Sequence, residues 1–225
     1  MKFEAVIFDL DGTLLDTLED IADSANAVLS KMSFPEHPVD SYRWFVGDGM
    51  QELAKRALPE HNCEQRLIER FEREVKQQYS VRWADKTTAY PGIEEMLSNL
   101  EQRKQKIAAL SNKPDEFTRI IMEKFFPEIH FDAVYGLKPD VPKKPAPSGA
   151  LKIAQELRIP PEKFLYLGDT NTDMQTAVSA GMYPVGALWG FRDREELEAN
   201  GAKALVDKPA EVIVILKDEE LIVDR

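Results

Sequence analysis

The sequence has one cysteine, few histidines and no long apolar run. Cys63 cannot form an intrachain disulfide, and because no histidine nearby could activate it, we expect a bystander thiol rather than a nucleophile. The histidines are scattered, and their spacing is not that of a zinc site: His37, His61 and His130. The apolar run Val6–Phe8 is too short for a secretory leader or a membrane span. We therefore expect a cytoplasmic protein without a membrane partner.

Positive charge is also scarce. The chain has 29 Lys and Arg against 40 Asp and Glu, which gives a formal net charge of -11. This balance argues against a general nucleic-acid binder, which would present a basic face. A site for an anionic substrate would have to concentrate positive charge locally. With 225 residues, 43% of them hydrophobic, the chain can form one large domain or a domain with a smaller insert.

Short β-rich runs alternate with amphipathic helical patterns along most of the chain. The expected strands are Ala5–Phe8, Lys106–Leu110, Ala133–Tyr135, Phe164–Leu167, Pro184–Leu188 and Ala204–Val206. The expected helices include Ile93–Gln102, Pro114–Phe125, Ser148–Leu157 and Asp173–Ala180. This alternation predicts an α/β fold with a doubly wound, Rossmann-like parallel sheet. In such sheets ligands bind beyond the carboxyl ends of the strands, where the strand order reverses.

One region, from about residue 17 to residue 83, contains no convincing strand. The run Thr17–Asp20 is typical of a capping box that opens a helix, and apolar residues then recur at helical spacing. Further helical patterns follow Gly49 and cover Leu67–Tyr79. We therefore predict a small all-helical cap inserted after the first strand. The expected division is residues 1–16 for the first part of the core, 17–84 for the cap and 85–225 for the second part of the core.

Four stretches rich in acids, hydroxyls or lysine end the predicted strands or follow them closely: Asp9–Thr13, Leu110–Pro114, Lys143–Pro147 and Leu167–Asp173. Taken singly, each has a plainer explanation, because Asp and Gly after a strand often form only a turn, and paired lysines are usually solvated. Taken together at one sheet edge, they could handle a phosphate and a hard cation. Carboxylate oxygens suit Mg²⁺, and a lysine with a helix N-terminus can offset phosphate charge.

These stretches, in this order, resemble the motifs of the haloacid dehalogenase-like superfamily of phosphohydrolases. The first motif is Asp9-Leu10-Asp11-Gly12-Thr13, and the second is Ser111 at a strand end. The third is a lysine before a Pro-x-Pro pattern, which Lys144 fits better than Lys143, and the fourth runs from Gly168-Asp169 to Asp173. The predicted helical insert lies where a subgroup of the superfamily carries its small mobile cap.

The resemblance implies a role for each acid. Asp9 would be the nucleophile that forms an aspartyl-phosphate, and its carboxylate needs no base because it is ionised at neutral pH. Asp11 would protonate the leaving oxygen and then deprotonate the attacking water. For the first step Asp11 must hold a proton, which burial and the nearby acids favour and magnesium opposes. Asp9, the backbone carbonyl of Asp11, and Asp169 would bind Mg²⁺, while Asp173 would orient the site without binding the ion.

The remaining residues of these motifs would bind the substrate. The resemblance assigns the phosphoryl group to Thr13, Ser111, Asn112 and Lys144, and it makes Ser111 and Lys144 part of the catalytic set. In the cap, Arg43 and the backbone N–H groups around Gly47 and Gly49 could bind the rest of the substrate. A surface arginine and a plain helix N-cap are the open alternatives there.

Softer resemblances favour the phosphoglycolate phosphatase group: Phe45–Gly49, Ala89–Gly92, Ser111–Pro114 and Trp189-Gly190. We therefore expect a magnesium-dependent phosphatase of a small phosphorylated metabolite. A β-phosphoglucomutase-like phosphosugar mutase, a pyrophosphatase and a nucleotidase stay open. A phosphonate hydrolase or a dehalogenase is disfavoured, because those relatives lack the aspartate at the position of Asp11. A phosphorylated receiver-like signalling domain is the non-enzyme alternative, although such domains are shorter and have no helical insert.

Overall fold

The computed structural model describes residues 3–59, 61, 64–139 and 141–217. The chain forms two compact units, one made of Met1–Leu14 with Ala89–Arg225 and the other of Leu15–Thr88. They are called the core and the helical unit below. Cys63 lies outside the described residues. Within the described ranges, no helix combines the length and the apolar character that a membrane span requires.

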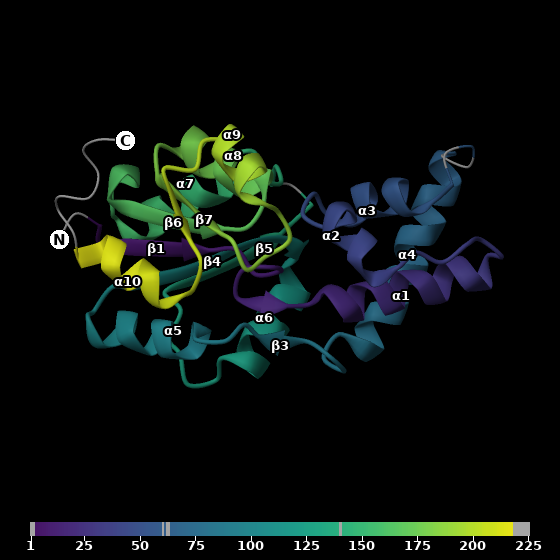
Figure 1. Cartoon of the computed structure of the whole chain (residues 1–225), viewed down its shortest axis with the longest axis horizontal. Helices are drawn as coiled ribbons and strands as arrows, with labels where there is room; N and C mark the ends of the chain where they lie inside the picture. The colour runs from purple at the N-terminus through teal and green to yellow at the C-terminus, as the bar shows by residue number, and fades with distance from the viewer. Residues whose placement is uncertain (1–2, 60, 62–63, 140, 218–225) are drawn as a thin grey trace. The chain divides into compact units, whose positions relative to one another are not determined.

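The core contains a parallel sheet. Within the described residues it has six strands, in the order β5-β4-β1-β6-β7-β8 (Figure 1). The strands are β1 (Ala5–Phe8), β4 (Lys106–Pro114), β5 (Ala133–Leu137), β6 (Phe164–Gly168), β7 (Tyr183–Ala187) and β8 (Ala204–Val206). Every residue of β1 and β6 is buried, as expected for central strands covered on both faces. The predicted α/β fold class is confirmed.

Helices cover both faces of this sheet. They are α5 (Ile93–Gln102), α6 (Asp115–Phe125), α7 (Ser148–Leu157), α8 (Asn171–Ala180), α9 (Arg194–Ala199) and α10 (Ala210–Lys217), with the short 3₁₀ turn η3 (Pro161–Lys163). Figure 1 shows α5 and α10 on one face and α7 and α8 on the other. Right-handed crossovers produce this arrangement, because the chain moves from β1 through β4 to β5 in one direction and from β6 to β8 in the other. The order therefore reverses beside β1.

The expected elements of the core match the structure in position and differ at their ends. Helices α5 and α7 have the expected bounds, whereas α8 begins at Asn171 instead of Asp173. Strand β7 starts and ends one residue earlier than expected. Strand β4 continues to Pro114, and its register with β5 is irregular after Leu110. This irregular end matters because it carries the second motif.

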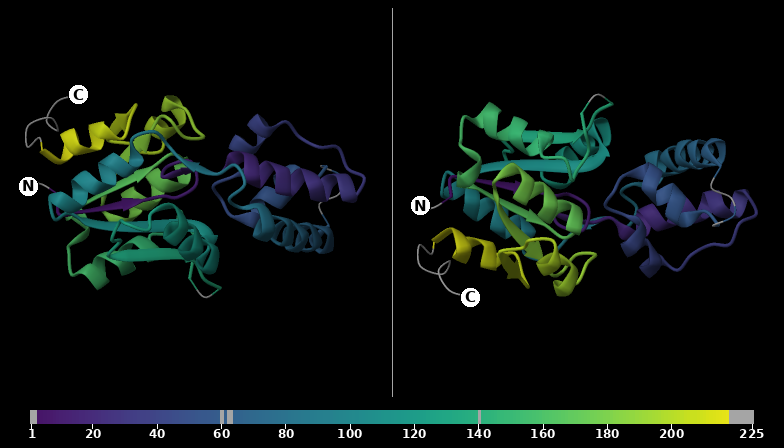
Figure 2. Two further views of the ribbon diagram at one scale, coloured as in Figure 1. Left: turned by 90° about the horizontal axis from the view of Figure 1, so that it is seen from below. Right: turned by 90° about the horizontal axis from the view of Figure 1, so that it is seen from above.

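The helical unit consists of α1 (Leu18–Lys31), the 3₁₀ turn η1 (Val39–Ser41), α2 (Tyr42–Phe45), α3 (Met50–Ala57) and α4 (Gln65–Arg82). Helix α1 packs along α4, and both views in Figure 2 show them side by side. Their apolar faces are buried, with Ile21 and Val28 on α1 and Phe71 and Val75 on α4. The segments that enter and leave the unit pair as the short strands β2 (Leu15–Asp16) and β3 (Thr88–Ala89).

The capping box predicted at Thr17–Asp20 is wrong. Thr17 is the N-cap of α1, but its side chain makes no capping hydrogen bond. The buried carboxylate of Asp20 instead accepts hydrogen bonds from the backbone N–H groups of Lys86 and Thr87 and from the Thr87 hydroxyl. A partner distant in sequence prevails because it satisfies several buried donors at once. Asp20 thus fastens the segment that leaves the unit to the first turn of α1.

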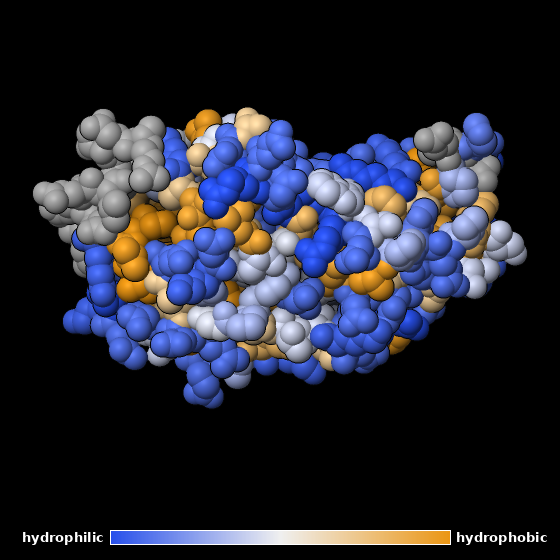
Figure 3. Space-filling model, viewed as in Figure 1, coloured by the Kyte–Doolittle hydropathy of each residue, from blue (hydrophilic) through white to orange (hydrophobic). Residues whose placement is uncertain are grey.

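The surface seen in Figure 3 is largely hydrophilic, which agrees with a charged-residue content of 31%. Apolar side chains gather over α10, where Val214 is 48% exposed. The opposite side of this helix, with Val212 and Leu216, is buried.

Candidate active site

Three neighbouring strands bring the predicted motifs together. Asp9 follows β1, Asp169 follows β6, and Ser111 lies on the irregular end of β4. In β1, Phe8 is level with Ala109 of β4 and Leu167 of β6. The polar residues that come next therefore emerge at one edge of the sheet, beside the point where the strand order reverses, as expected for a ligand site in this architecture.

A cluster of acids lies at this edge. Among the described residues, Asp9, Asp169 and Asp173 each offer a carboxylate oxygen, and these atoms lie within 4.8 Å of one another. The three residues are 5%, 0% and 0% exposed. Buried carboxylates at such distances repel unless protons or cations intervene. The cluster could hold a metal ion, and a set of oxygen ligands fits Mg²⁺. Asp173, which the sequence predicts to orient the site, belongs to this group of oxygens.

Lys144 bridges two of these acids. Its Nζ is 2.8 Å from Oδ1 of Asp9 and 2.7 Å from Oδ1 of Asp173, and its side chain is 3% exposed. Burial, together with Asp173, raises the pKa of Asp9 well above its usual range, although Lys144 opposes this shift. Burial alone would lower the pKa of Lys144, but the carboxylates of Asp173 and Asp9 raise it well above its usual value. Lys144 therefore keeps its charge and offsets part of the negative charge of the cluster.

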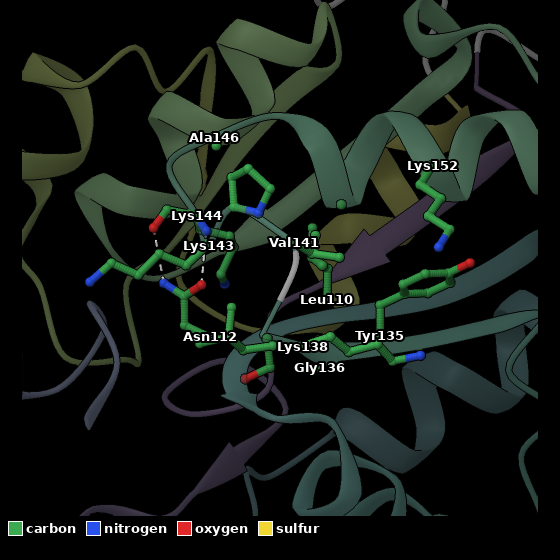
Figure 4. A pocket seen from close by; sticks show the side chains of 14 residues that line it. Leu110, Asn112, Tyr135, Gly136, Lys138, Val141, Lys143, Lys144, Ala146 and Lys152 are labelled. Carbon is green, nitrogen blue, oxygen red and sulfur yellow. Dashed lines mark hydrogen bonds between the residues drawn. The ribbon is translucent and has the colours of Figure 1, made fainter. Parts of the chain in front are cut away.

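Asn112 holds the loop that carries Lys144. Its side-chain Nδ2 donates to the backbone oxygen of Lys144 at 3.1 Å, and its Oδ1 accepts from the backbone nitrogen of Lys144 at 2.8 Å. Figure 4 shows this pair of bonds at one side of a recess lined by β4, β5, the loop before α7 and α7 itself. The side chain of Asn112 thus positions Lys144. Its predicted contact with the phosphoryl group stays a prediction.

Asp169 is oriented by two donors. The hydroxyl of Thr13 donates to Oδ1 at 2.7 Å, and the backbone N–H of Phe191 donates to Oδ2 at 2.9 Å. Burial and the charge of Asp173 raise the pKa of Asp169 to about 7, and the two hydrogen bonds only partly oppose this. Thr13 therefore orients a predicted metal ligand, and its predicted contact with the phosphoryl group stays a prediction.

Close packing around Asp169 explains the glycine of the first motif. Gly12 has φ +84°, and a Cβ atom built there would lie 2.2 Å from Oδ2 of Asp169. The loop after β7 packs against the same motif, since Trp189 Nε1 donates to the backbone oxygen of Thr13 at 3.0 Å. Trp189 therefore packs the loop after β7 against the first motif.

Asp11 has a partner that the sequence analysis missed. The Nζ of Lys113 lies 2.9 Å from Oδ1 of Asp11, and the two side chains are 5% and 14% exposed. From the sequence, only acids and magnesium were expected as charged neighbours of Asp11. The available signal was position, because Lys113 lies two residues after Ser111 in the second motif. The backbone N–H of Lys113 also donates to the Ser111 hydroxyl at 3.1 Å, so the two residues form one local structure.

The predicted substrate-binding residues of the helical unit have contacts within that unit. Arg43 Nε is 3.6 Å from Oδ1 of Asp40, and the arginine side chain is 39% exposed. Gly49 is the N-cap of α3, as the plainer interpretation expects. Arg56, which the sequence analysis missed, donates to the backbone oxygens of Trp44 and Phe45 and pairs with Asp48, so it holds the glycine-containing loop. Substrate binding by Arg43, Gly47 and Gly49 stays a prediction.

Comparison with known proteins agrees with this arrangement. Residues 6–187 match the model of the haloacid dehalogenase-like hydrolase family. A phosphoglycolate phosphatase from Psychrobacter arcticus is 31% identical over 224 residues, which cover 96% of this chain and 97% of that protein. The crystal structure described as that of a phosphoglycolate phosphatase from Lactobacillus delbrueckii subsp. bulgaricus has a TM-score of 0.88 at 30% identity. The match covers 94% of this chain and 97% of that one. A predicted phosphatase from Clostridium acetobutylicum has a TM-score of 0.86 at 25% identity and covers 97% and 100%.

The chain therefore belongs to the haloacid dehalogenase-like hydrolase family, and the predicted family resemblance is confirmed. Its fold and enzyme class are those of a phosphatase of this family.

Proposed function

We propose that this protein is a magnesium-dependent phosphatase that hydrolyses small phosphomonoesters through an aspartyl-phosphate on Asp9, with 2-phosphoglycolate as the preferred substrate. The observation that carries the proposal is that Asp9, Asp169, Asp173 and Lys144 lie together beside the carboxyl ends of β1 and β6 in a chain of this family. Mg²⁺ would bind at Asp9, the backbone carbonyl of Asp11, and Asp169, where it would offset charge as two anions approach.

In the first half of the reaction, a carboxylate oxygen of Asp9 attacks phosphorus and the bond from phosphorus to the leaving oxygen breaks. Lys144, which lies 2.8 Å from Asp9, keeps this buried carboxylate oriented. Asp11 gives its proton to the leaving oxygen, so the organic product departs as an alcohol. Ser111 and the backbone N–H groups that follow it would hold the phosphoryl oxygens.

In the second half, water attacks the phosphorus of the aspartyl-phosphate and loses a proton to Asp11. The bond between phosphorus and Asp9 breaks, which releases inorganic phosphate and restores both side chains. The same residue thus acts as acid and then as base, as the two half-reactions require. Asp173 and Thr170 keep Lys144 in position, since Asp173 accepts hydrogen bonds from Lys144 and from the hydroxyl of Thr170.

The substrate preference rests on the relatives. The Psychrobacter arcticus protein, which aligns with nearly the full length of this chain, is a phosphoglycolate phosphatase. A relative from Aquifex aeolicus with the same name is 31% identical and covers 83% of this chain. Phosphoglycolate is a short ester whose phosphate group is a dianion and whose organic half carries a carboxylate. We propose that the helical unit acts as a cap and binds part of this organic half through Arg43 and the N–H groups at Gly47 and Gly49.

The test is a panel of substrates assayed for phosphate release with Mg²⁺: 2-phosphoglycolate, phosphosugars, nucleotides, pyrophosphate and p-nitrophenyl phosphate. The parent should show its highest kcat/KM with 2-phosphoglycolate, and Asp9→Asn should lose turnover while keeping its circular dichroism spectrum. Near-parental turnover of a folded Asp9→Asn variant would refute the assignment of the nucleophile. Conversion of a phosphosugar without phosphate release would instead indicate a mutase, and a single phosphorylation without turnover would indicate a receiver-like protein.

The contribution of Arg43 can be measured with the same panel. Arg43→Ala should lower kcat/KM for 2-phosphoglycolate relative to p-nitrophenyl phosphate. Arg70→Ala is a matched control, because Arg70 is also an exposed arginine of the helical unit and pairs with Glu74 on its own helix. If Arg43→Ala and Arg70→Ala leave the same ranking of substrates, the prediction for Arg43 is wrong.

A further inference from the structure

The steps of the proposed reaction assign no role to the ion pair between Lys113 and Asp11. Lys113 comes from the irregular end of β4, and its ammonium lies 2.9 Å from the carboxylate of Asp11. With a side chain only 5% exposed, this lysine is far more buried than Lys138, whose side chain is 45% exposed. A buried ammonium is costly unless it is well paired. The burial of this ammonium group beside Asp11 therefore suggests that it has a role in the active site.

The neighbours of Lys113 in sequence have different tasks. Ser111 accepts a hydrogen bond from the backbone of Lys113, and the side chain of Asn112 binds the backbone of Lys144. Lys144 itself is committed to Asp9 and Asp173. The ammonium of Lys113 lies against Asp11, the proposed acid and base.

The structure of 2-phosphoglycolate would bring its carboxylate close to Lys113. In the proposed reaction Asp11 protonates the ester oxygen, so that oxygen must lie within hydrogen-bond reach of the Asp11 carboxylate. In 2-phosphoglycolate the carboxylate carbon is two bonds from the ester oxygen, so its oxygens lie within about 4 Å of it. An ammonium has three donors. One can stay on Asp11 while another reaches the substrate carboxylate.

We propose that Lys113 binds the carboxylate of the substrate, so that the core itself selects phosphorylated 2-hydroxy acids over esters that lack an anionic group next to the phosphate. This inference rests on the proposed function and names a residue that determines its specificity. The ammonium would contact the substrate on one side and Asp11 on the other, which places the carboxylate beside the leaving oxygen. An uncharged group in the same place would leave a buried ammonium donor without its partner, and this is a strong basis for discrimination.

The experiment compares two substrates that differ at the proposed contact. Ethyl phosphate has a methyl group where 2-phosphoglycolate has its carboxylate. The ratio of kcat/KM for 2-phosphoglycolate to that for ethyl phosphate is measured in the parent and in Lys113→Met, which keeps the length of the side chain and removes its charge. We expect the ratio to fall by about tenfold or more, chiefly through the loss of activity toward 2-phosphoglycolate. Lys113→Arg should keep more of the preference than Lys113→Met.

Lys138→Met is the matched control. It removes the same charge from the core, but Lys138 is exposed and pairs with Asp115 at 3.6 Å, so its ratio should equal that of the parent. If Lys113→Met does not fold, Lys113→Gln and Lys113→Arg are measured in the same way. An equal loss on both substrates would overturn the inference, because Lys113 would then act only through Asp11. A parent that does not prefer 2-phosphoglycolate to ethyl phosphate would also overturn it, whereas a parent without phosphatase activity would refute the proposed function itself.

Discussion

Replacing Lys144 by Met tests the charge balance of the site most directly. The substitution removes the ammonium that lies 2.8 Å from Asp9 and 2.7 Å from Asp173. Methionine has a similar length and fills much of the same volume, so the loss reflects charge more than a cavity. Two buried carboxylates are left without their shared partner.

The expected cost follows from the burial of all three groups. Breaking a buried ion pair by removing one partner typically costs about 3–5 kcal/mol of folding free energy, because the remaining charge is uncompensated. Two acids lose their partner here, so we expect a value toward the upper end of that range near pH 7.5 without metal. The penalty should shrink as the pH falls. Lys144 opposes the rise in the pKa of Asp9 that burial causes, so this pKa is higher still without Lys144. As the pH falls, the folded variant therefore takes up more protons than the folded parent, and the difference in stability between them decreases.

The assay is urea unfolding in excess chelator at pH 7.5 and pH 5, followed by the fluorescence of Trp189. This residue belongs to the core and contacts Thr13. The other two tryptophans, Trp44 and Trp83, belong to the helical unit, so both are replaced by Phe in every variant that is compared. The signal then reports the core alone.

Lys138→Met again serves as the control, and because the side chain of Lys138 is 45% exposed and lies 3.6 Å from Asp115 we expect a loss of at most about 1 kcal/mol. The reasoning fails if Lys144→Met costs no more than this control. It also fails if the penalty grows as the pH falls, because the buried acids would then not be the source of the effect.

Three further predictions concern single groups. Asp11→Asn should still form some phosphoenzyme from p-nitrophenyl phosphate, whose leaving group needs little protonation, and should hydrolyse it slowly; equal losses with an alkyl phosphate, without any accumulated intermediate, would contradict the role of Asp11. Chelation should abolish turnover, and Mg²⁺ but not Ca²⁺ should restore it, because calcium takes more ligands in looser geometry; full activity in excess chelator would show that no metal is needed. Asp20→Asn should destabilise the helical unit by about 2–3 kcal/mol, because a charged hydrogen-bond acceptor is lost. Faster amide hydrogen exchange around Thr87 would show this loss. The control is Asp23→Asn, which removes an exposed ion pair with Lys86 and should change the exchange rate little.

Local patterns were sufficient to predict most of the core. The apolar run of β1 is followed at once by Asp9, which marks a buried strand that ends in a polar turn. Helices α5 and α7 carry apolar residues at helical spacing within their own ranges, and their bounds agree with the prediction. The motif positions then followed from one geometric rule, because parallel strands end at the same edge of a sheet.

Contacts between segments distant in sequence were beyond such patterns. The pairing of Lys113 with Asp11 depends on the irregular end of β4, where the side-chain alternation of a regular strand no longer applies. The Asn112 bonds to the backbone of Lys144 join residues 32 positions apart. The misinterpretation of Asp20 has the same origin, since its partners lie 66 and 67 positions further along the chain. A short pattern cannot indicate which of several partners a carboxylate will find.

The charges at the site explain how a chain with a net charge of -11 could process a phosphate. The carboxylates of Asp9, Asp169 and Asp173 form a cluster that contacts the ammonium group of Lys144, and the carboxylate of Asp11 pairs with the ammonium group of Lys113. With every group ionised, the negative charges outnumber the positive ones by two, and this excess would repel a phosphate dianion. Burial and the neighbouring acids raise the pKa of Asp9 and that of Asp169, the latter to about 7, so both groups tend to bind protons. A divalent cation bound at the same oxygens would restore neutrality and displace those protons. The metal and the protons are therefore alternatives, and the two buried lysines concentrate positive charge at the site of a chain that is acidic overall.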